Sequence, residues 1–214
     1  MDLGERKNPS RASTSENLNR YVEALRDVRT PLEGFCNILN LSLSIQAYSR
    51  YDGTMPTKVM TKKQLAPLLQ KIRAQKKRIV FTNGCFDLMH IGHTRYLQAA
   101  RALGDVLVVG VNSDTSVRSL NKAPDRPIVS EAQRAEVVAA LGCVDYVILF
   151  DEPDPQGLIA ALQPDVLVKG GDWAVERIVG RELVEARGGI VRTIPLVPGV
   201  STTSIVERIR STTT

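Results

Sequence analysis

The chain has 214 residues, of which 43% are hydrophobic, so it is long and apolar enough for one globular domain with an appendage. It contains no apolar run long enough to cross a bilayer, no apolar signal segment near its start, and three scattered cysteines without metal-binding spacing. These features argue against a membrane-spanning, secreted or zinc-binding protein, and we expect a cytoplasmic protein without membrane contact.

The net charge of +5 is unevenly distributed along the chain. Up to Arg78, 15 Lys and Arg residues stand against 7 Asp and Glu, whereas from Ile79 onward 13 stand against 16. The C-terminal part therefore lacks the extended basic surface that is typical of nucleic-acid-binding domains. We expect small-molecule partners, and no nucleic-acid partner, for this part.

Residues 1–57 differ from the rest in composition. They are polar and rich in Ser, Thr and Asn, which is typical of disorder, although residues 18–28 have the apolar spacing of a short amphipathic helix. We predict a partly disordered N-terminal extension over residues 1–57 and one domain over residues 58–214. Met55 and Met60 each precede a more regular sequence, so two interpretations stay open, a non-conserved extension or an upstream start.

From residue 58 onward, helical and strand-like segments alternate. Thr61 and Gln64 form a capping box that opens a helix ending near residue 74, and Ser130 and Gln133 form a second box that opens a helix over residues 130–141. Further helices are expected at residues 96–103, 158–162, 181–186 and 205–209, and strands at residues 79–82, 105–112, 144–150, 165–169 and 190–194. This order predicts an α/β fold with a Rossmann-like, doubly wound parallel sheet of about five strands.

Residues 78–93 carry the strongest functional signal. They run from a strand through a glycine-containing loop to a helix start, which favours phosphate binding because the first helical N–H groups lack internal partners. His90 and His93 are three residues apart and project to one side of the first helical turn, and Gly92 lets a phosphate approach the backbone. The imidazoles can donate hydrogen bonds to developing phosphoryl charge, although a capping, core or metal-binding pair stays an alternative.

Polar segments also follow the later predicted strands, at the edge where ligands bind in open α/β sheets. Asn112 and Asp114 follow the second strand, although Ser113 or Asp114 could simply cap the next turn. Lys169 precedes two glycines and Asp172, and offers a compact positive charge for a phosphate unless it is a solvated lysine beside a turn.

Two further segments complete the predicted edge. Residues 201–204, Ser-Thr-Thr-Ser, begin the last helix, where hydroxyl and N–H groups could bind phosphates or serve only as an N-cap. Lys122 and Arg126 lie in a loop that could supply further phosphate contacts, although loop charges are often only solvated. Arg134, on the following helix, is a weaker candidate.

Four of these segments together resemble a known family. TNGCFDLMHIGH, VNSD, LVKGGDW and STTSIVERI are similar to segments of the cytidylyltransferase-like nucleotidyltransferases, and the resemblance extends over nearly all of residues 76–210. Within this superfamily the chain resembles the D-glycero-β-D-manno-heptose 1-phosphate adenylyltransferases, which in some organisms are fused to a heptose kinase. Members usually carry Lys-Gly where this chain has Lys122 and Ala123. The resemblance implies a stand-alone homodimer that works beside a separate heptose kinase.

The same resemblance implies a reaction and a set of site residues. AMP is transferred from ATP to the sugar 1-phosphate and pyrophosphate leaves, with Mg²⁺ held through the nucleotide phosphates and not by dedicated protein ligands. Catalytic roles are implied for His90, His93 and Lys122. Nucleotide binding is implied for Thr82, Asn83, Gly84, Cys85, Phe86, Gly92, Lys169, Gly170, Gly171, Asp172, Ser201, Thr202, Thr203 and Ser204, and acceptor binding for Asp87, Asn112, Asp114 and Arg126.

Three other functions fit parts of the pattern. A cytidylyltransferase acting on glycerol 3-phosphate or another alcohol phosphate would have the same fold. The letters HIGH at residues 90–93 also occur in class I aminoacyl-tRNA synthetases, but a KMSKS-like loop is missing and the chain is too short for an anticodon domain. A non-catalytic nucleotide-binding regulator with a basic N-terminal arm would not explain why every phosphate-handling loop is present.

Overall fold

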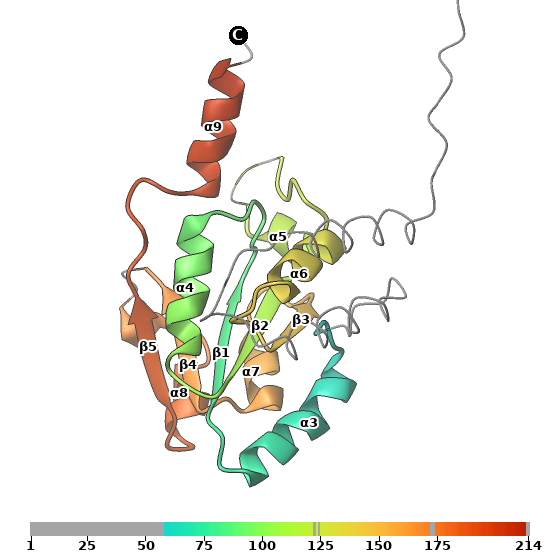
Figure 1. The fold of residues 1–214 in the computed structure, drawn as a ribbon, viewed down its shortest axis with the longest axis vertical. Helices are drawn as coiled ribbons and strands as arrows, with labels where there is room; N and C mark the ends of the chain where they lie inside the picture. Colours follow the sequence, from blue (N-terminus) through green and yellow to red (C-terminus); the bar gives the residue numbers. More distant parts are fainter. Residues whose placement is uncertain (1–57, 122, 124, 172–173, 213–214) are drawn as a thin grey trace, which may run out of the picture. The chain divides into compact units, whose positions relative to one another are not determined.

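Five parallel strands form a single sheet in the computed structural model, which describes residues 58–121, 123, 125–171 and 174–212 (Figure 1). They are β1 (Ile79–Gly84), β2 (Val106–Asn112), β3 (Tyr146–Phe150), β4 (Val166–Gly170) and β5 (Ile190–Ile194). Their order in the sheet is β3-β2-β1-β4-β5. The chain therefore winds outward from β1 in one direction and then returns to continue on the other side, which confirms the predicted Rossmann-like fold and places the switch point between β1 and β4.

Eight helices accompany this sheet in the described residues. They are α3 (Lys62–Ala74), α4 (Ile91–Arg101), α5 (Asp114–Ser119), α6 (Glu131–Ala139), α7 (Gln156–Leu162), the 3₁₀ helix η1 (Val175–Arg177), α8 (Arg181–Glu185) and α9 (Thr202–Thr212). None of the helices in the described ranges is long and apolar enough to cross a membrane.

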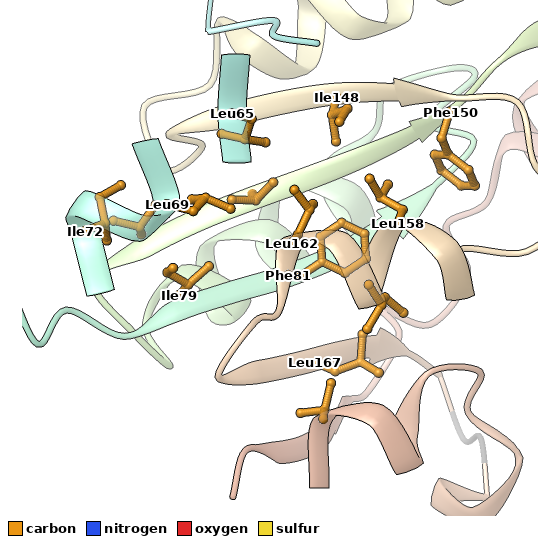
Figure 2. Close-up of a cluster of buried hydrophobic side chains, with 14 of the residues drawn as sticks. Leu65, Leu69, Ile72, Ile79, Phe81, Ile148, Phe150, Leu158, Leu162 and Leu167 are labelled. Carbon is orange, nitrogen blue, oxygen red and sulfur yellow. The ribbon is translucent and has the colours of Figure 1, made fainter. Parts of the chain in front are cut away.

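Alternate side chains of the buried strands enter two separate apolar cores. One core joins the sheet to α3, α7 and α8, and Figure 2 shows Leu65 and Leu69 of α3 in the same cluster as Phe81 of β1 and Leu162 of α7. The other core joins the opposite face of the sheet to α4 and α6. Because β1, β2 and β4 are covered on both faces, their residues read as continuous apolar runs in the sequence.

The local signals at helix starts had different outcomes. The capping box at the start of α3 is confirmed, since the Thr61 hydroxyl accepts from the Gln64 N–H and the Gln64 side chain accepts from the Thr61 N–H. The second predicted box is wrong, because the Ser130 side chain caps no backbone N–H and instead donates to the Gln133 side chain. The last helix is longer than predicted and begins at Thr202, with the Ser201 hydroxyl accepting from the Ser204 N–H.

Two short helices were not predicted as helices. Ser113 caps α5 by accepting from the Ser116 N–H at 3.1 Å, so the capping interpretation holds for this serine. The 3₁₀ helix η1 follows β4. The predicted extension, including the amphipathic helix over residues 18–28, lies outside the described residues.

Candidate functional site

A cavity of about 810 Å³ opens at the carboxyl ends of β1, β2 and β4. Most of the predicted site residues line it: Asn83, Gly84, Cys85, Phe86, Asp87, His90, Gly92, His93, Asn112, Arg126, Lys169, Gly170, Ser201, Thr202 and Thr203. Thr82, Asp114, Gly171 and Ser204 do not line it. Lys122 and Asp172 lie outside the described residues. The volume is within the range of small-molecule sites, and the location is the one expected for ligands of open α/β sheets.

The two histidines meet at the start of α4. Their rings stack with centroids 3.9 Å apart and an interplanar angle of 18°, and Phe86 packs its ring edge-on against His93. A Cβ atom on Gly92 would lie 2.9 Å from the His90 ring, so the stacked pair requires glycine at this position. The Nδ1 atoms of both histidines are buried, and neither has a hydrogen-bond partner among the described residues. A buried polar atom without a hydrogen-bond partner lowers the stability of the fold, so this arrangement favours binding of a ligand that provides the partner.

Both imidazoles are held in the neutral form. Burial and, to a smaller extent, the neighbouring His90 lower the pKa of His93 to about 4. Burial also lowers the pKa of His90. At neutral pH each ring therefore carries one N–H donor and one acceptor nitrogen.

The lowered pKa of His93 predicts a pH dependence of stability. Between the ordinary value of 6.5 and about 4, the unfolded chain binds a proton at residue 93 that the folded chain does not bind, so the free energy of unfolding should fall as the pH falls through this window. Denaturant unfolding of the wild type and of His93→Gln across this window will measure the effect. Carboxylates contribute equally to both proteins, and identical slopes would contradict the assignment.

Asp87 joins the histidine loop to the loop before α6. Its carboxylate accepts from the Ile128 and Val129 N–H groups, each at 2.9 Å, and from Arg126 Nη1 at 2.9 Å. The Asp87 side chain is 2% exposed and that of Arg126 is 15% exposed. Asp87 and Arg126 thus form a wall of the cavity as an ion pair, and their predicted contact with an acceptor stays a prediction.

Arg134 lies at the centre of a buried polar network behind the cavity. Its side chain has no exposed surface, and its guanidinium donates to Cys85 O at 2.5 Å, Val129 O at 2.8 Å and Asp114 Oδ1 at 2.8 Å. The sequence-based interpretation of Arg134 as a weak phosphate contact is therefore wrong, because the guanidinium is enclosed by protein. Its hydrogen bonds connect the loop that carries Cys85 to the segments that carry Val129 and Asp114. Asp114 therefore belongs to this network, and it does not line the cavity.

Several of the remaining predicted residues line the cavity and also bind neighbouring protein groups. Lys169 Nζ donates to Asn83 Oδ1 across the ends of β1 and β4. Asn112 donates from its side chain to the Ser116 hydroxyl while lining the cavity. At the start of α9, Ser201 and Ser204 hydrogen-bond to each other, and Ser201, Thr202 and Thr203 contribute to the cavity wall.

The cavity wall also contains Tyr96, Arg177 and Arg210, which were not predicted as site residues. Tyr96 lies in the segment 96–103, for which only a helix was predicted, and an arginine in a short turn carries no local signal. The described ranges contain no group of three or more His, Cys, Asp or Glu side chains arranged to hold a metal ion.

Comparisons with known proteins agree with this architecture. The profile of the family described as cytidylyltransferase-like matches residues 81–212. The chain is 55% identical over 153 residues to the bifunctional protein HldE of Syntrophotalea carbinolica, a match that covers 72% of this chain and 31% of that protein. It is 56% identical over 147 residues to the bifunctional protein HldE of Geotalea uraniireducens, covering 69% and 30%. The chain thus spans about a third of the length of these relatives.

A solved structure supports the fold. Pantoate-beta-alanine ligase from Francisella tularensis, crystallised with a β,γ-ATP ligand and β-alanine, is similar with a TM-score of 0.51 at 15% identity, over 72% of this chain and 77% of that protein. The sheet order, the cavity at the switch point and the profile match over more than half of the residues lead to one conclusion. The chain belongs to the cytidylyltransferase-like family.

Proposed function

We propose that this chain is a nucleotidyltransferase that transfers AMP from ATP to D-glycero-β-D-manno-heptose 1-phosphate, giving ADP-heptose and pyrophosphate. The observation that carries the reaction class is the stacked pair His90 and His93, which lines the cavity at a helix start and whose Nδ1 atoms have no hydrogen-bond partner among the described residues. The acceptor follows from the motif resemblance. The identities of 55% and 56% to the HldE proteins support the same branch of the family.

The proposed chemistry needs little proton transfer. A phosphate oxygen of the acceptor attacks the α-phosphorus of ATP, the bond to the bridging oxygen breaks, and pyrophosphate leaves with the electron pair. Because the nucleophile is already anionic, the protein contributes mainly positioning and charge stabilisation. The neutral rings of His90 and His93 donate to the phosphoryl oxygens as charge develops, and Lys169 and the N–H groups at the start of α9 hold the triphosphate.

Several further assignments belong to the proposal. Mg²⁺ bound through phosphate oxygens would neutralise charge on the leaving pyrophosphate. Lys122 would contact the α-phosphate. Residues 58–214 would form the catalytic domain and residues 1–57 an extension, in a cytoplasmic homodimer that works beside a separate heptose kinase.

Pyrophosphate release by the full chain with Mg²⁺ will test this function. ATP and CTP are each combined with heptose 1-phosphate and with glycerol 3-phosphate, and the double variant His90→Ala, His93→Ala sets the background. We expect release above background only with ATP and heptose 1-phosphate. Release with CTP and glycerol 3-phosphate would preserve the reaction class and overturn the substrates. ATP binding without release in any pair would overturn the catalytic proposal in favour of a regulator.

A further inference from the structure

At the floor of the cavity, the pairing between β1 and β4 ends and the two strands separate. On its other side, β1 pairs with β2 at six consecutive positions, ending with Gly84 opposite Val111. The ladder between β1 and β4 consists of two pairs and ends with Phe81 opposite Leu167. Beyond that pair the chains continue into residues that line the cavity, namely Asn83, Gly84, Lys169 and Gly170. The opening at the switch point therefore begins where Thr82 and Val168 face each other.

The side chain of Tyr96 spans this opening at the position where the ladder ends. Tyr96, on α4, donates from its hydroxyl to Val168 O at 3.2 Å, and the Tyr96 hydroxyl oxygen lies 2.5 Å from the Thr82 hydroxyl oxygen. Tyr96 has one hydroxyl proton, and Val168 O can only accept, so the Thr82 hydroxyl donates to Tyr96. A chain of two hydrogen bonds thus replaces the missing rung between β1 and β4.

The bridge persists at every physiological pH. Burial raises the pKa of Tyr96 to about 12, against an opposing effect of the hydrogen bond from Thr82. Thr82 is fully buried, so water does not compete for its hydroxyl. Fully satisfied buried hydrogen bonds of this kind fix the relative positions of the segments they join.

The residues next to the bridge meet across the same opening. Asn83 follows Thr82 and Lys169 follows Val168, and Lys169 Nζ donates to Asn83 Oδ1. The Tyr96 ring packs against the next residue of β4, since a Cβ atom on Gly170 would lie 3.3 Å from Tyr96 Cε2. The separation of the two strand ends at Tyr96 thereby sets where Lys169 and Asn83 stand in the cavity wall.

We infer that Tyr96 is a positioning residue, whose hydroxyl fixes the width of the switch-point opening and so places Lys169 and Asn83 for contact with nucleotide phosphates. That the ligand is a nucleotide phosphate rests on the proposed function, whereas the hydrogen-bonded bridge and its effect on the position of Asn83 do not. Tyr96→Phe removes the hydroxyl and leaves the ring. Thr82→Val removes the other half of the bridge with little change of volume.

Two measurements on the full chain test this inference. In the ligand-free protein, the side-chain amide resonances of Asn83 should shift in Tyr96→Phe and Thr82→Val in the same direction as in Lys169→Ala, which removes the lysine partner. In calorimetric titrations with ATP and Mg²⁺, Tyr96→Phe and Thr82→Val should each raise the Kd for ATP by about 3–10-fold, which corresponds to the loss of one neutral hydrogen bond. When Lys169 is already replaced by alanine, Tyr96→Phe should cause no further loss of ATP affinity. Tyr146→Phe, in β3, is the matched control.

The outcomes separate the inference from the proposed function. Wild-type resonances of Asn83 in both bridge variants would overturn the positioning role. An ATP affinity loss of equal size with and without Lys169 would also overturn it, because the hydroxyl would then act independently of that lysine. If the wild type binds no ATP, the proposed function fails, and the Asn83 resonances of the ligand-free variants alone decide the inference. If Tyr96→Phe is poorly folded, Thr82→Val gives the result.

Discussion

Replacing His93 by alanine is expected to lower the maximal rate of pyrophosphate formation by about 10²–10³-fold, while the affinity for ATP changes far less. Removing one preorganised donor to a developing phosphoryl charge costs roughly 3–4 kcal/mol of transition-state stabilisation. The donor acts mainly in the transition state, so the loss should appear in kcat and not in ATP binding. Steady-state kinetics with calorimetric ATP binding will measure the two effects separately.

His90→Ala is expected to behave similarly, because its ring stacks on that of His93 and both Nδ1 atoms lack partners among the described residues. The double variant should lose less than the product of the two single losses, since each ring supports the orientation of the other. Gln98→Ala, an exposed position on the same helix that does not line the cavity, is the control. Near-normal turnover of either single variant would refute the role of that imidazole.

Replacing Arg134 by alanine is expected to lower the free energy of unfolding by about 3–5 kcal/mol, the usual cost of breaking a buried ion pair by removing one partner. The substitution leaves the Asp114 carboxylate and the carbonyls of Cys85 and Val129 without the guanidinium that satisfies them. Denaturant unfolding of the full chain will measure the loss.

A matched pair of variants separates charge from geometry in this network. Arg134→Lys keeps the positive charge but cannot donate to three separated acceptors through a planar fork, so most of the loss should remain. Arg118→Ala, an exposed arginine on α5, should change stability by less than about 0.5 kcal/mol. If Arg134→Ala were as stable as Arg118→Ala, the network would have no structural role.

Local sequence patterns predicted most of the elements. The five strands lie where the apolar runs placed them, and the helix that begins beside His90 follows the glycine-containing loop as expected. The capping box at Thr61 was readable because both of its partners lie within one turn. The box at Ser130 has the same spacing, with serine in place of threonine, and its hydroxyl also donates to the glutamine side chain, but the two bonds to the backbone N–H groups do not form.

The arrangement of the site was predicted only in part. The motifs indicated which loops meet at the cavity, because the carboxyl ends of parallel strands share one edge of a sheet. They did not indicate that the Asp87 carboxylate would accept hydrogen bonds from residues 126–129, or that the Arg134 side chain would be fully buried. Polar side chains at such positions can face either ligand or protein, and the identity of the residue does not decide between the two.

The sequence by itself therefore determined the alternation of buried strands and amphipathic helices, and the histidine pair at a helix start, because these depend on residues within a few positions of one another. The tertiary structure alone decided the contacts that shape the site. Arg134 meets Cys85 across 49 positions of sequence, Tyr96 meets Val168 across 72, and Lys169 meets Asn83 across 86. These pairs form only because β1 lies beside β4 in the sheet and α4 and α6 pack on the same face, and strand order is a property of the whole chain.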